Sequence, residues 1–138
     1  ELVTFYDLAN NVGTGEVNIS WIDKVKPEGT VSYSTTNWTN QDVVATLTTT
    51  KVVTKPSGWS GAATGTSFTK SYSVNTTETV NFSDLVTNTN SANVSITNID
   101  KTAPVCGSWS YSPTVPTSGN VIATLAGSTD GSSGISVG

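Results

Sequence analysis

The sequence predicts an all-β fold made of β-sandwich modules in tandem, and three observations carry this prediction. The chain repeats itself at an offset near 77 residues, its apolar residues alternate with polar ones in short runs, and turn-forming residues separate those runs. Six or seven short alternating strands, separated by turns, within roughly 77 residues are typical of β-sandwiches. The sequence contains no long apolar stripe with the 3.6-residue period of an amphipathic helix.

The repeat has two aligned parts. Residues 1–27 match residues 78–104 at an offset of 77, with 12 of 27 positions identical. After one inserted residue, residues 32–47 match residues 110–125 at an offset of 78, with 9 of 16 positions identical. A fixed period of this length indicates an array of modules.

The phase of the repeat divides the chain into three parts. We expect the C-terminal strands of one module in residues 1–23, a complete module in residues 24–100 and the N-terminal strands of a following module in residues 101–138. The chain is then most simply a window of a longer array. The alternative is a self-assembling subunit, in which the tail of one chain completes the head of the next by strand addition. The strand-forming parts of the two partial modules, residues 1–23 and 105–138, are together about 20 residues shorter than one module, which favours the window.

Within the complete module, period-2 alternation predicts six or seven short strands. In chain order, the apolar positions of these runs are Val31 and Tyr33; Val43, Ala45 and Leu47; Val52 and Val53; Phe68, Tyr72 and Val74; Val80 and Phe82; and Ala92, Val94 and Ile96. Residues 56–65 are rich in Gly, Ser and Ala and predict a loop. The residues predicted for the core are Val43, Ala45, Leu47, Phe82, Val94 and Ile96.

Composition argues against several classes of function. Six Lys and Arg residues against ten Asp and Glu give a net charge of −4, which disfavours nucleic acid as a partner because its binding depends on cationic side chains. Histidine, the commonest general base, is absent, and we find no nucleophile–base pair or phosphate-binding loop, so we do not expect an enzyme. The one cysteine, Cys106, permits no internal disulfide, and no apolar stretch of this segment is long enough to span a membrane.

Several runs carry a family resemblance: NWTNQDVVATLT (37–48), KPSGWSG (55–61), SFTKSYSVNTTETVNFSDLVTN (67–88), and the linkers IDKVKP (22–27) and IDKTAP (99–104). In these runs the chain resembles the bacterial immunoglobulin-like repeats of large cell-surface proteins. The resemblance implies immunoglobulin-like β-sandwich modules in tandem, an extracellular or cell-surface location, and neighbouring copies of the module as partners, in the chain or in a fibre.

Two roles follow from that resemblance. The first is structural: a stalk, filament or cell-surface element that spaces or projects other domains or assembles into a fibre. The alternative is an adhesin-type binding module that contacts carbohydrate or protein through its loops. The alternative needs a contiguous exposed aromatic patch, for example around Trp59.

Acidic residues recur at identical positions of the repeat and suggest a metal site. An immunoglobulin-like topology would bring Glu1, Asp23 and Asp84 together at the first junction between modules. Because Ca²⁺ prefers several oxygen ligands, we identify these three carboxylates as a candidate calcium site, the one cofactor that we consider. The alternative is that Asp23 and Asp100 cap the linker turns while Asp84 binds the backbone of its own turn.

The linkers are predicted to be stiff. Pro27 and Pro104 end the two linkers, and proline fixes its own φ angle while holding the preceding residue in an extended conformation. A short linker with proline restricts motion far more than a Gly/Ser tether does. We therefore expect ordered, extended linkers of similar geometry at both junctions.

Lys70 lies in the inward-facing phase of its predicted strand and has two interpretations. Some surface immunoglobulin-like modules contain a buried lysine bonded covalently to an asparagine beside a carboxyl group, and here Asn81 or Asn93 beside Glu78 would supply those groups. The alternative is a lysine on an edge strand that blocks strand-to-strand aggregation.

Overall fold

The computed structural model describes residues 1–136, and within them the chain is all-β. Nine strands and no helix lie in this range. The strands are β1 (Leu2–Tyr6), β2 (Val12–Glu16), β3 (Gly29–Tyr33), β4 (Val43–Thr54), β5 (Thr64–Tyr72), β6 (Thr76–Ser83), β7 (Thr89–Ile96), β8 (Ser108–Ser112) and β9 (Ile122–Ala126). Thr or Val recurs in most of them, because β-branched side chains suit the pleated backbone.

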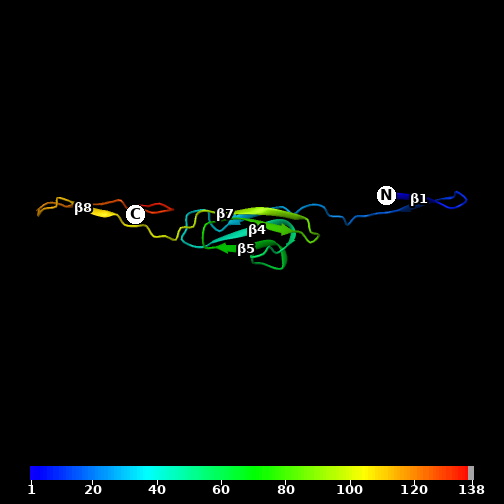
Figure 1. Cartoon of the computed structure of the whole chain (residues 1–138), viewed down its shortest axis with the longest axis horizontal. Coiled ribbons are helices and arrows are strands. Elements are labelled where there is room, and N and C mark those ends of the chain that lie inside the picture. Colours follow the sequence, from blue (N-terminus) through cyan, green and yellow to red (C-terminus); the bar gives the residue numbers. More distant parts are fainter. Residues whose placement is uncertain (137–138) are drawn as a thin grey trace.

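The strands form small antiparallel sheets. In the described residues β1 pairs with β2, β3–β4–β5 form a three-stranded sheet, β6 pairs with β7 and β8 pairs with β9. Figure 1 shows an elongated molecule in which strands β3 to β7 lie together in the middle. The β1–β2 hairpin extends from one end of this group and the β8–β9 hairpin from the other.

Strands β3 to β7 pack in two layers, which we call the central unit. The sheet β3–β4–β5 is one layer and the hairpin β6–β7 is the other, with β7 lying against β3 and β6 against β4. The layers enclose one hydrophobic core, made of Val43, Ala45, Leu47, Val53, Trp59, Phe68, Tyr72, Val80, Phe82, Val94, Ile96 and Ile99. Val31, Tyr33 and Ala92 pack against it.

The core confirms the sequence prediction and enlarges it. All six residues predicted for the core are buried. Along β4, every second side chain points into the core while Val44 faces solvent, as period-2 alternation requires. Trp59 is also buried, although it lies in the stretch predicted as a loop. Val74, expected to continue the alternation after Tyr72, is exposed because β5 ends at Tyr72.

Strand β4 is longer than predicted. The runs around Leu47 and Val53 form a single strand, whose pairing with β5 shifts register between Thr48 and Val53. Val53 lies six residues after Leu47, so the period-2 alternation of β4 continues past the shift and buries Val53 while Val52 remains exposed. An isolated bridge between Val53 and Asp84 then connects the end of β4 to the other layer.

The repeated sequences form hairpins with the same register. In the β1–β2 hairpin, Leu2 pairs with Glu16, and in the β6–β7 hairpin the residues 77 positions later, Thr79 and Asn93, pair with each other. The β3–β4 and β8–β9 hairpins correspond in the same way at an offset of 78. Of the third predicted segment, residues 101–138, the last two lie outside the described residues.

Candidate functional site

Asp84 organises the turn between β6 and β7. Its Oδ1 accepts hydrogen bonds from the backbone N–H groups of Val86 at 3.1 Å and Asn88 at 2.9 Å, and its Oδ2 accepts from Asn88 Nδ2 at 2.9 Å. This satisfies the turn backbone while Thr87 adopts a positive φ of 69°. The aspartate thus fixes the shape of the turn that faces the preceding linker.

The turn between β1 and β2 repeats these contacts. Asp7 Oδ1 accepts from the backbone N–H groups of Ala9 at 2.8 Å and Asn11 at 2.9 Å, and Asp7 Oδ2 accepts from Asn11 Nδ2 at 2.7 Å. Asn10, which corresponds to Thr87, also has a positive φ, of 64°. The identical Asp–Leu pair of the two copies therefore specifies the same turn.

Asp23 and Asp100 cap the two linkers. Asp23 Oδ1 accepts a hydrogen bond from the Val25 backbone N–H at 3.0 Å, and Asp100 Oδ1 accepts one from the Thr102 N–H at 3.0 Å. Each aspartate binds the backbone two residues later, which is an Asx turn. The capping interpretation of Asp23, Asp84 and Asp100 is thereby confirmed.

Lys51 joins the first linker to the central unit. Its Nζ lies 2.6 Å from Asp23 Oδ2 and 3.1 Å from Asp84 Oδ2. The same ammonium donates a hydrogen bond to the Val25 carbonyl oxygen at 2.6 Å. One cation therefore bridges two carboxylates from segments far apart in the sequence, together with a linker carbonyl.

The protonation behaviour of these groups follows from their contacts. The hydrogen bond from the Asn88 side chain is the largest influence on Asp84, and with the turn N–H groups and Lys51 it lowers the pKa of Asp84 to about 2. The hydrogen bond from Lys51 lowers the pKa of Asp23, and Asp23 in turn raises the pKa of Lys51. Both carboxylates and the ammonium are thus charged at neutral pH.

Backbone and amide contacts hold the rest of the first linker. Asn88 Nδ2 donates to the Asp23 carbonyl oxygen at 3.2 Å, and Asn90 Nδ2 donates to the Pro27 carbonyl oxygen at 2.8 Å. The Glu28 N–H donates to Thr50 Oγ1 at 3.0 Å, the Glu28 carbonyl oxygen accepts from the Thr50 N–H at 2.9 Å, and the Pro27 side chain is fully buried. We call the contacts of Lys51, Asp84, Asn88 and Asn90 with the linker the linker anchor.

The second linker is held by a related arrangement. Asp100 Oδ2 accepts a hydrogen bond from the Ser133 backbone N–H at 2.9 Å, just as Asp23 Oδ2 contacts Lys51 in the segment that follows its own linker. Lys101 Nζ lies 2.6 Å from Asp42 Oδ1 at the surface of the central unit. Both linkers therefore begin with a capped aspartate whose second oxygen binds the next segment.

The three residues predicted to bind calcium are not all together. Asp23 and Asp84 meet at Lys51, whereas Glu1 lies in the outer hairpin, where its amino group binds the Val17 carbonyl oxygen at 2.8 Å. Figure 1 shows that hairpin well away from β4 and β7. Among residues 1–136, no three acidic, His or Cys side chains form a metal-binding group. Calcium binding stays a prediction, with Lys51 already placed between two of its proposed ligands.

Sequence reasoning missed Lys51, although a signal for it existed. Three carboxylates at one pole require a counter-ion, and a search for the cation on the same pole would have found the lysine that interrupts the long Thr/Val run of β4. The ammonium supplies that positive charge without a metal. The linker anchor is therefore an ion cluster that holds the first linker against β4 and the β6–β7 turn.

A second charged cluster surrounds Glu78. Lys70 Nζ donates to both Glu78 carboxylate oxygens, at 2.8 and 2.9 Å, and Tyr72 Oη donates to Oε1 at 2.5 Å. Lys70 lies on β5, the outer strand of its sheet, in the position expected of an edge-strand lysine. These contacts lower the pKa of Glu78, chiefly through Lys70, and burial raises the pKa of Tyr72.

Neither asparagine considered for the covalent crosslink of Lys70 forms a hydrogen bond with that lysine. Of the two candidate partners, Asn93 accepts a hydrogen bond from Thr79 Oγ1 at 3.0 Å on the outer face of the β6–β7 hairpin. Asn81 lines the same shallow hollow as Lys70 and Glu78 without a hydrogen bond to either. The non-covalent ion pair is the arrangement that the structure contains.

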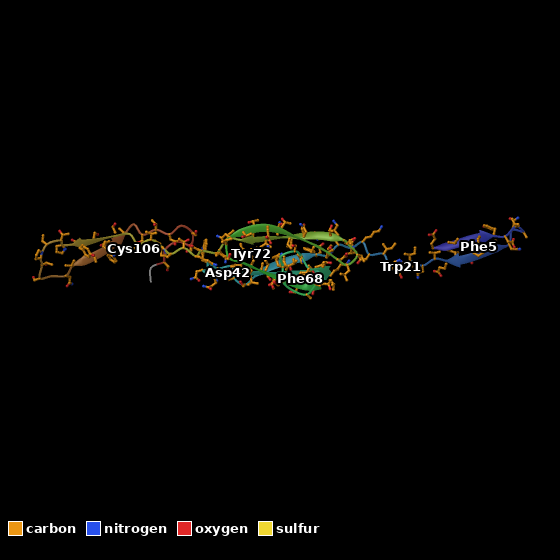
Figure 2. All side chains as sticks on the ribbon, turned by 60° about the horizontal axis from the view of Figure 1, so that its bottom comes forward. Phe5, Trp21, Asp42, Phe68, Tyr72 and Cys106 are labelled. Atoms are coloured by element: carbon orange, nitrogen blue, oxygen red, sulfur yellow. The ribbon has the colours of Figure 1, made fainter. Side chains whose placement is uncertain are left out.

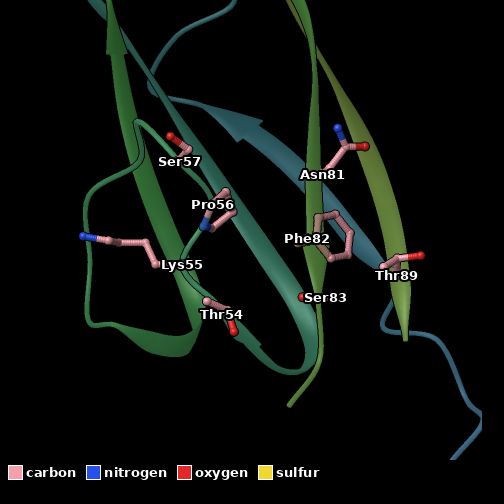
Figure 3. A pocket seen from close by; sticks show the side chains of 8 residues that line it. All are labelled: Thr54, Lys55, Pro56, Ser57, Asn81, Phe82, Ser83 and Thr89. Atoms are coloured by element: carbon pink, nitrogen blue, oxygen red, sulfur yellow. The ribbon is translucent and has the colours of Figure 1, made fainter. Parts of the chain in front are cut away.

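A small hollow lies between the end of β4 with the residues that follow it and the β6–β7 hairpin. It has a volume of about 280 Å³ and lies between residues 54–57 on one side and residues 81–83 with Thr89 on the other (Figure 3). Hydroxyl, amide and ammonium side chains line it together with the apolar side chains of Pro56 and Phe82. Trp59, around which the adhesin-type alternative would need an exposed aromatic patch, is buried in the core.

Comparison with family models, curated proteins and solved structures returned no match to this chain. In residues 1–136, no helix of the length and apolarity needed to cross a membrane occurs.

Proposed function

We propose that this chain is a structural repeat: tandem immunoglobulin-like β-sandwich modules of an extracellular stalk, filament or cell-surface protein, which space or project other domains. The observation that carries the proposal is the linker anchor, in which Lys51 binds Asp23 and Asp84 at 2.6 and 3.1 Å. A linker tied to the pole of the next unit transmits orientation along the chain. Stiff connection is the physical requirement of a spacer.

Three further features support this role. The two linkers share the Ile–Asp–Lys start and the Asx turn of the aspartate, which favours a repeated junction over an accidental contact. The buried Pro27 removes backbone freedom where the linker enters the central unit. Asp23, Asp84 and Lys51 are engaged in turns and ion pairs, and Lys70 is paired with Glu78, which favours a non-enzymatic role with neighbouring copies of the module as partners.

The cell-surface location is supported by the resemblance to bacterial surface repeats and by composition. Only 12% of residues are charged, and hydroxyl and amide side chains provide most of the polar surface. The two-layer packing of β3–β4–β5 on β6–β7 around a shared core supports an immunoglobulin-like module.

Small-angle X-ray scattering tests the stiffness on a protein with two consecutive copies of residues 24–100. Joining the copies recreates the sequence Ile99–Asp100–Lys24–Val25–Lys26–Pro27, so that Asp100 of the first copy takes the position of Asp23. We expect one extended shape with a narrow distribution of maximum dimension. A matched protein with a Gly/Ser linker of equal length should show a broad distribution.

Replacing the anchor lysine of the second copy, Lys51→Met, should broaden the distribution toward that of the Gly/Ser control, because it removes the cation that holds Asp100 and Asp84 together. Indistinguishable scattering from the native-linker and Gly/Ser proteins would overturn the proposed role.

A further inference from the structure

The two linkers leave the central unit at opposite ends, from two strands that run in the same direction. The first linker leads through Pro27 into β3, and the second linker follows β7 (Figure 1). Strand β7 lies against β3 and begins beside the first linker, where Asn90 Nδ2 donates to the Pro27 carbonyl oxygen at 2.8 Å. An isolated parallel bridge between Thr39 and Ile99 joins the segments that follow β3 and β7. A pull on the two linkers therefore draws these two parts of the chain past each other.

Hydrogen bonds hold the two segments together where the second linker begins. The Thr39 N–H donates to the Asn98 carbonyl oxygen at 2.9 Å, and the Asp100 N–H donates to the Thr39 carbonyl oxygen at 2.9 Å. The Asn98 side chain adds a bond from its Nδ2 to the Asn37 carbonyl oxygen at 2.6 Å. We call these contacts the exit clamp.

A core contact and an ion pair flank the exit clamp. The Ile99 side chain is buried in the core, and the Ile99 N–H donates to Asn75 Oδ1 at 2.8 Å. On the linker side, Lys101 Nζ lies 2.6 Å from Asp42 Oδ1. Figure 2 shows Asp42 at the end of the central unit opposite to Trp21, which lies on the first linker. The exit clamp is thus fixed to the core at the end that faces the second linker.

The direction of a load decides how the bonds of the exit clamp share it. Hydrogen bonds between paired strands run across the strand direction. A load along the strands strains all of these bonds together, whereas a load that parts the strands from one end breaks the bonds one at a time. Because the linkers leave at opposite ends, tension in the chain loads the exit clamp along the strands.

We propose that the exit clamp bears the load when the chain is under tension, which makes the central unit a force-resisting element. The inference rests on the proposed spacer role, because a spacer between other domains is pulled at both of its linkers. The exit clamp directly joins the segments through which load enters and leaves, so the core is stretched only after the clamp opens. Forced unfolding is governed by the unfolding rate, so the clamp contributes kinetic resistance beyond its share of equilibrium stability.

Magnetic tweezers test this on the whole 138-residue chain, held by its two ends at constant force. We expect Asn98→Ala to unfold the central unit about tenfold faster than the wild type at the same force. A barrier lowered by about 1.4 kcal/mol, the scale of one lost hydrogen bond, gives that change in rate. The matched control is Asn93→Ala, because the Asn93 side chain accepts from Thr79 Oγ1 on the outer face of the β6–β7 hairpin. Its unfolding rate should stay within about twofold of the wild-type rate.

A second attachment point separates the direction of the load from general stability. Asn40→Cys, in a chain that also carries Cys106→Ser, moves one handle to an exposed residue just after the exit clamp. Load then acts on the same end of both segments and parts them bond by bond. We expect unfolding more than about tenfold faster than with the handles at the chain ends, at the same force, because one hydrogen bond at a time opposes the load.

Three results would overturn the proposal: a wild-type rate for Asn98→Ala, an equal acceleration by Asn93→Ala, or the same unfolding rate with both attachment points. The comparison of attachment points keeps Asn98 in place, so it decides the matter even where Asn98→Ala fails to fold. None of these results would change the scattering test, which measures bending of the linker without tension, so the two proposals fail separately.

Discussion

Phe82 and Phe5 occupy the same position of the repeat in opposite surroundings, which makes them a matched pair for mutation. Phe82 is 4% exposed in the core and Phe5 is 59% exposed on the outer hairpin. Truncating a buried phenylalanine to alanine costs about 3–5 kcal/mol through lost transfer free energy and the cavity left behind. We expect Phe82→Ala to lower the free energy of unfolding of the central unit by that amount. Phe5→Ala should change the same free energy by less than about 0.5 kcal/mol, as for an ordinary surface position.

The size of the effect is large relative to the whole unit. At about 0.05–0.15 kcal/mol per residue, a unit of roughly 77 residues has a total stability of about 4–12 kcal/mol. Phe82→Ala should therefore remove between about a quarter and all of the stability of the central unit, while Phe5→Ala leaves it intact.

Urea denaturation followed by tryptophan fluorescence measures both variants. Trp59 is buried in the same core as Phe82, so its emission reports the unfolding of the central unit. Equal losses for the two variants, or a loss below about 1 kcal/mol for Phe82→Ala, would refute the assignment of the core.

Three further predictions concern packing and charge. Gly29→Ala should destabilise the central unit by about 1–3 kcal/mol through overpacking, because its Cβ would lie 2.4 Å from Phe82 Cζ, and an unchanged urea midpoint would contradict this. The pKa of Asp84 is lowered from 3.8 to about 2 in the folded state, so its stabilisation is present above pH 4 and is lost as pH falls toward 2. The melting temperature of the wild type should fall over that range, and that of Asp84→Asn should fall less. Added Ca²⁺ should leave the melting temperature unchanged, because the Lys51 ammonium already lies between Asp23 and Asp84; a rise at saturating Ca²⁺ would instead support the calcium site.

Local patterns predicted the core well because burial on one face of a strand imposes a period of two. The alternation along residues 43–47 placed three side chains in the core, and all three are fully buried. Trp59 escaped this reasoning, because a single aromatic in a Gly/Ser-rich loop has no periodic neighbours. The loop folds back through paired backbone hydrogen bonds between Ser60 and Thr69, which bring Trp59 into the core.

The candidate site was harder to predict because its contacts are long-range. Lys51 lies 28 residues from Asp23 and 33 from Asp84, and no local spacing indicates such pairs. Glu1 was placed at the junction by assuming that a compact module end lies against the linker. Instead, the chain from residue 17 to residue 23 has no regular secondary structure, and six extended residues span up to about 20 Å, which separates Glu1 from Asp23.

Hydrogen exchange of the whole chain at low concentration tests most directly the claim that one covered two-layer unit lies between two uncovered hairpins. Amides in stable, buried elements exchange only through rare opening, whereas weakly packed hairpins open readily. We expect slow exchange in the paired amides of β4, β5, β6 and β7, and fast exchange in β1–β2 and β8–β9. Protection of the outer hairpins equal to that of the central unit at all dilutions, or fast exchange throughout β6–β7, would contradict the claim.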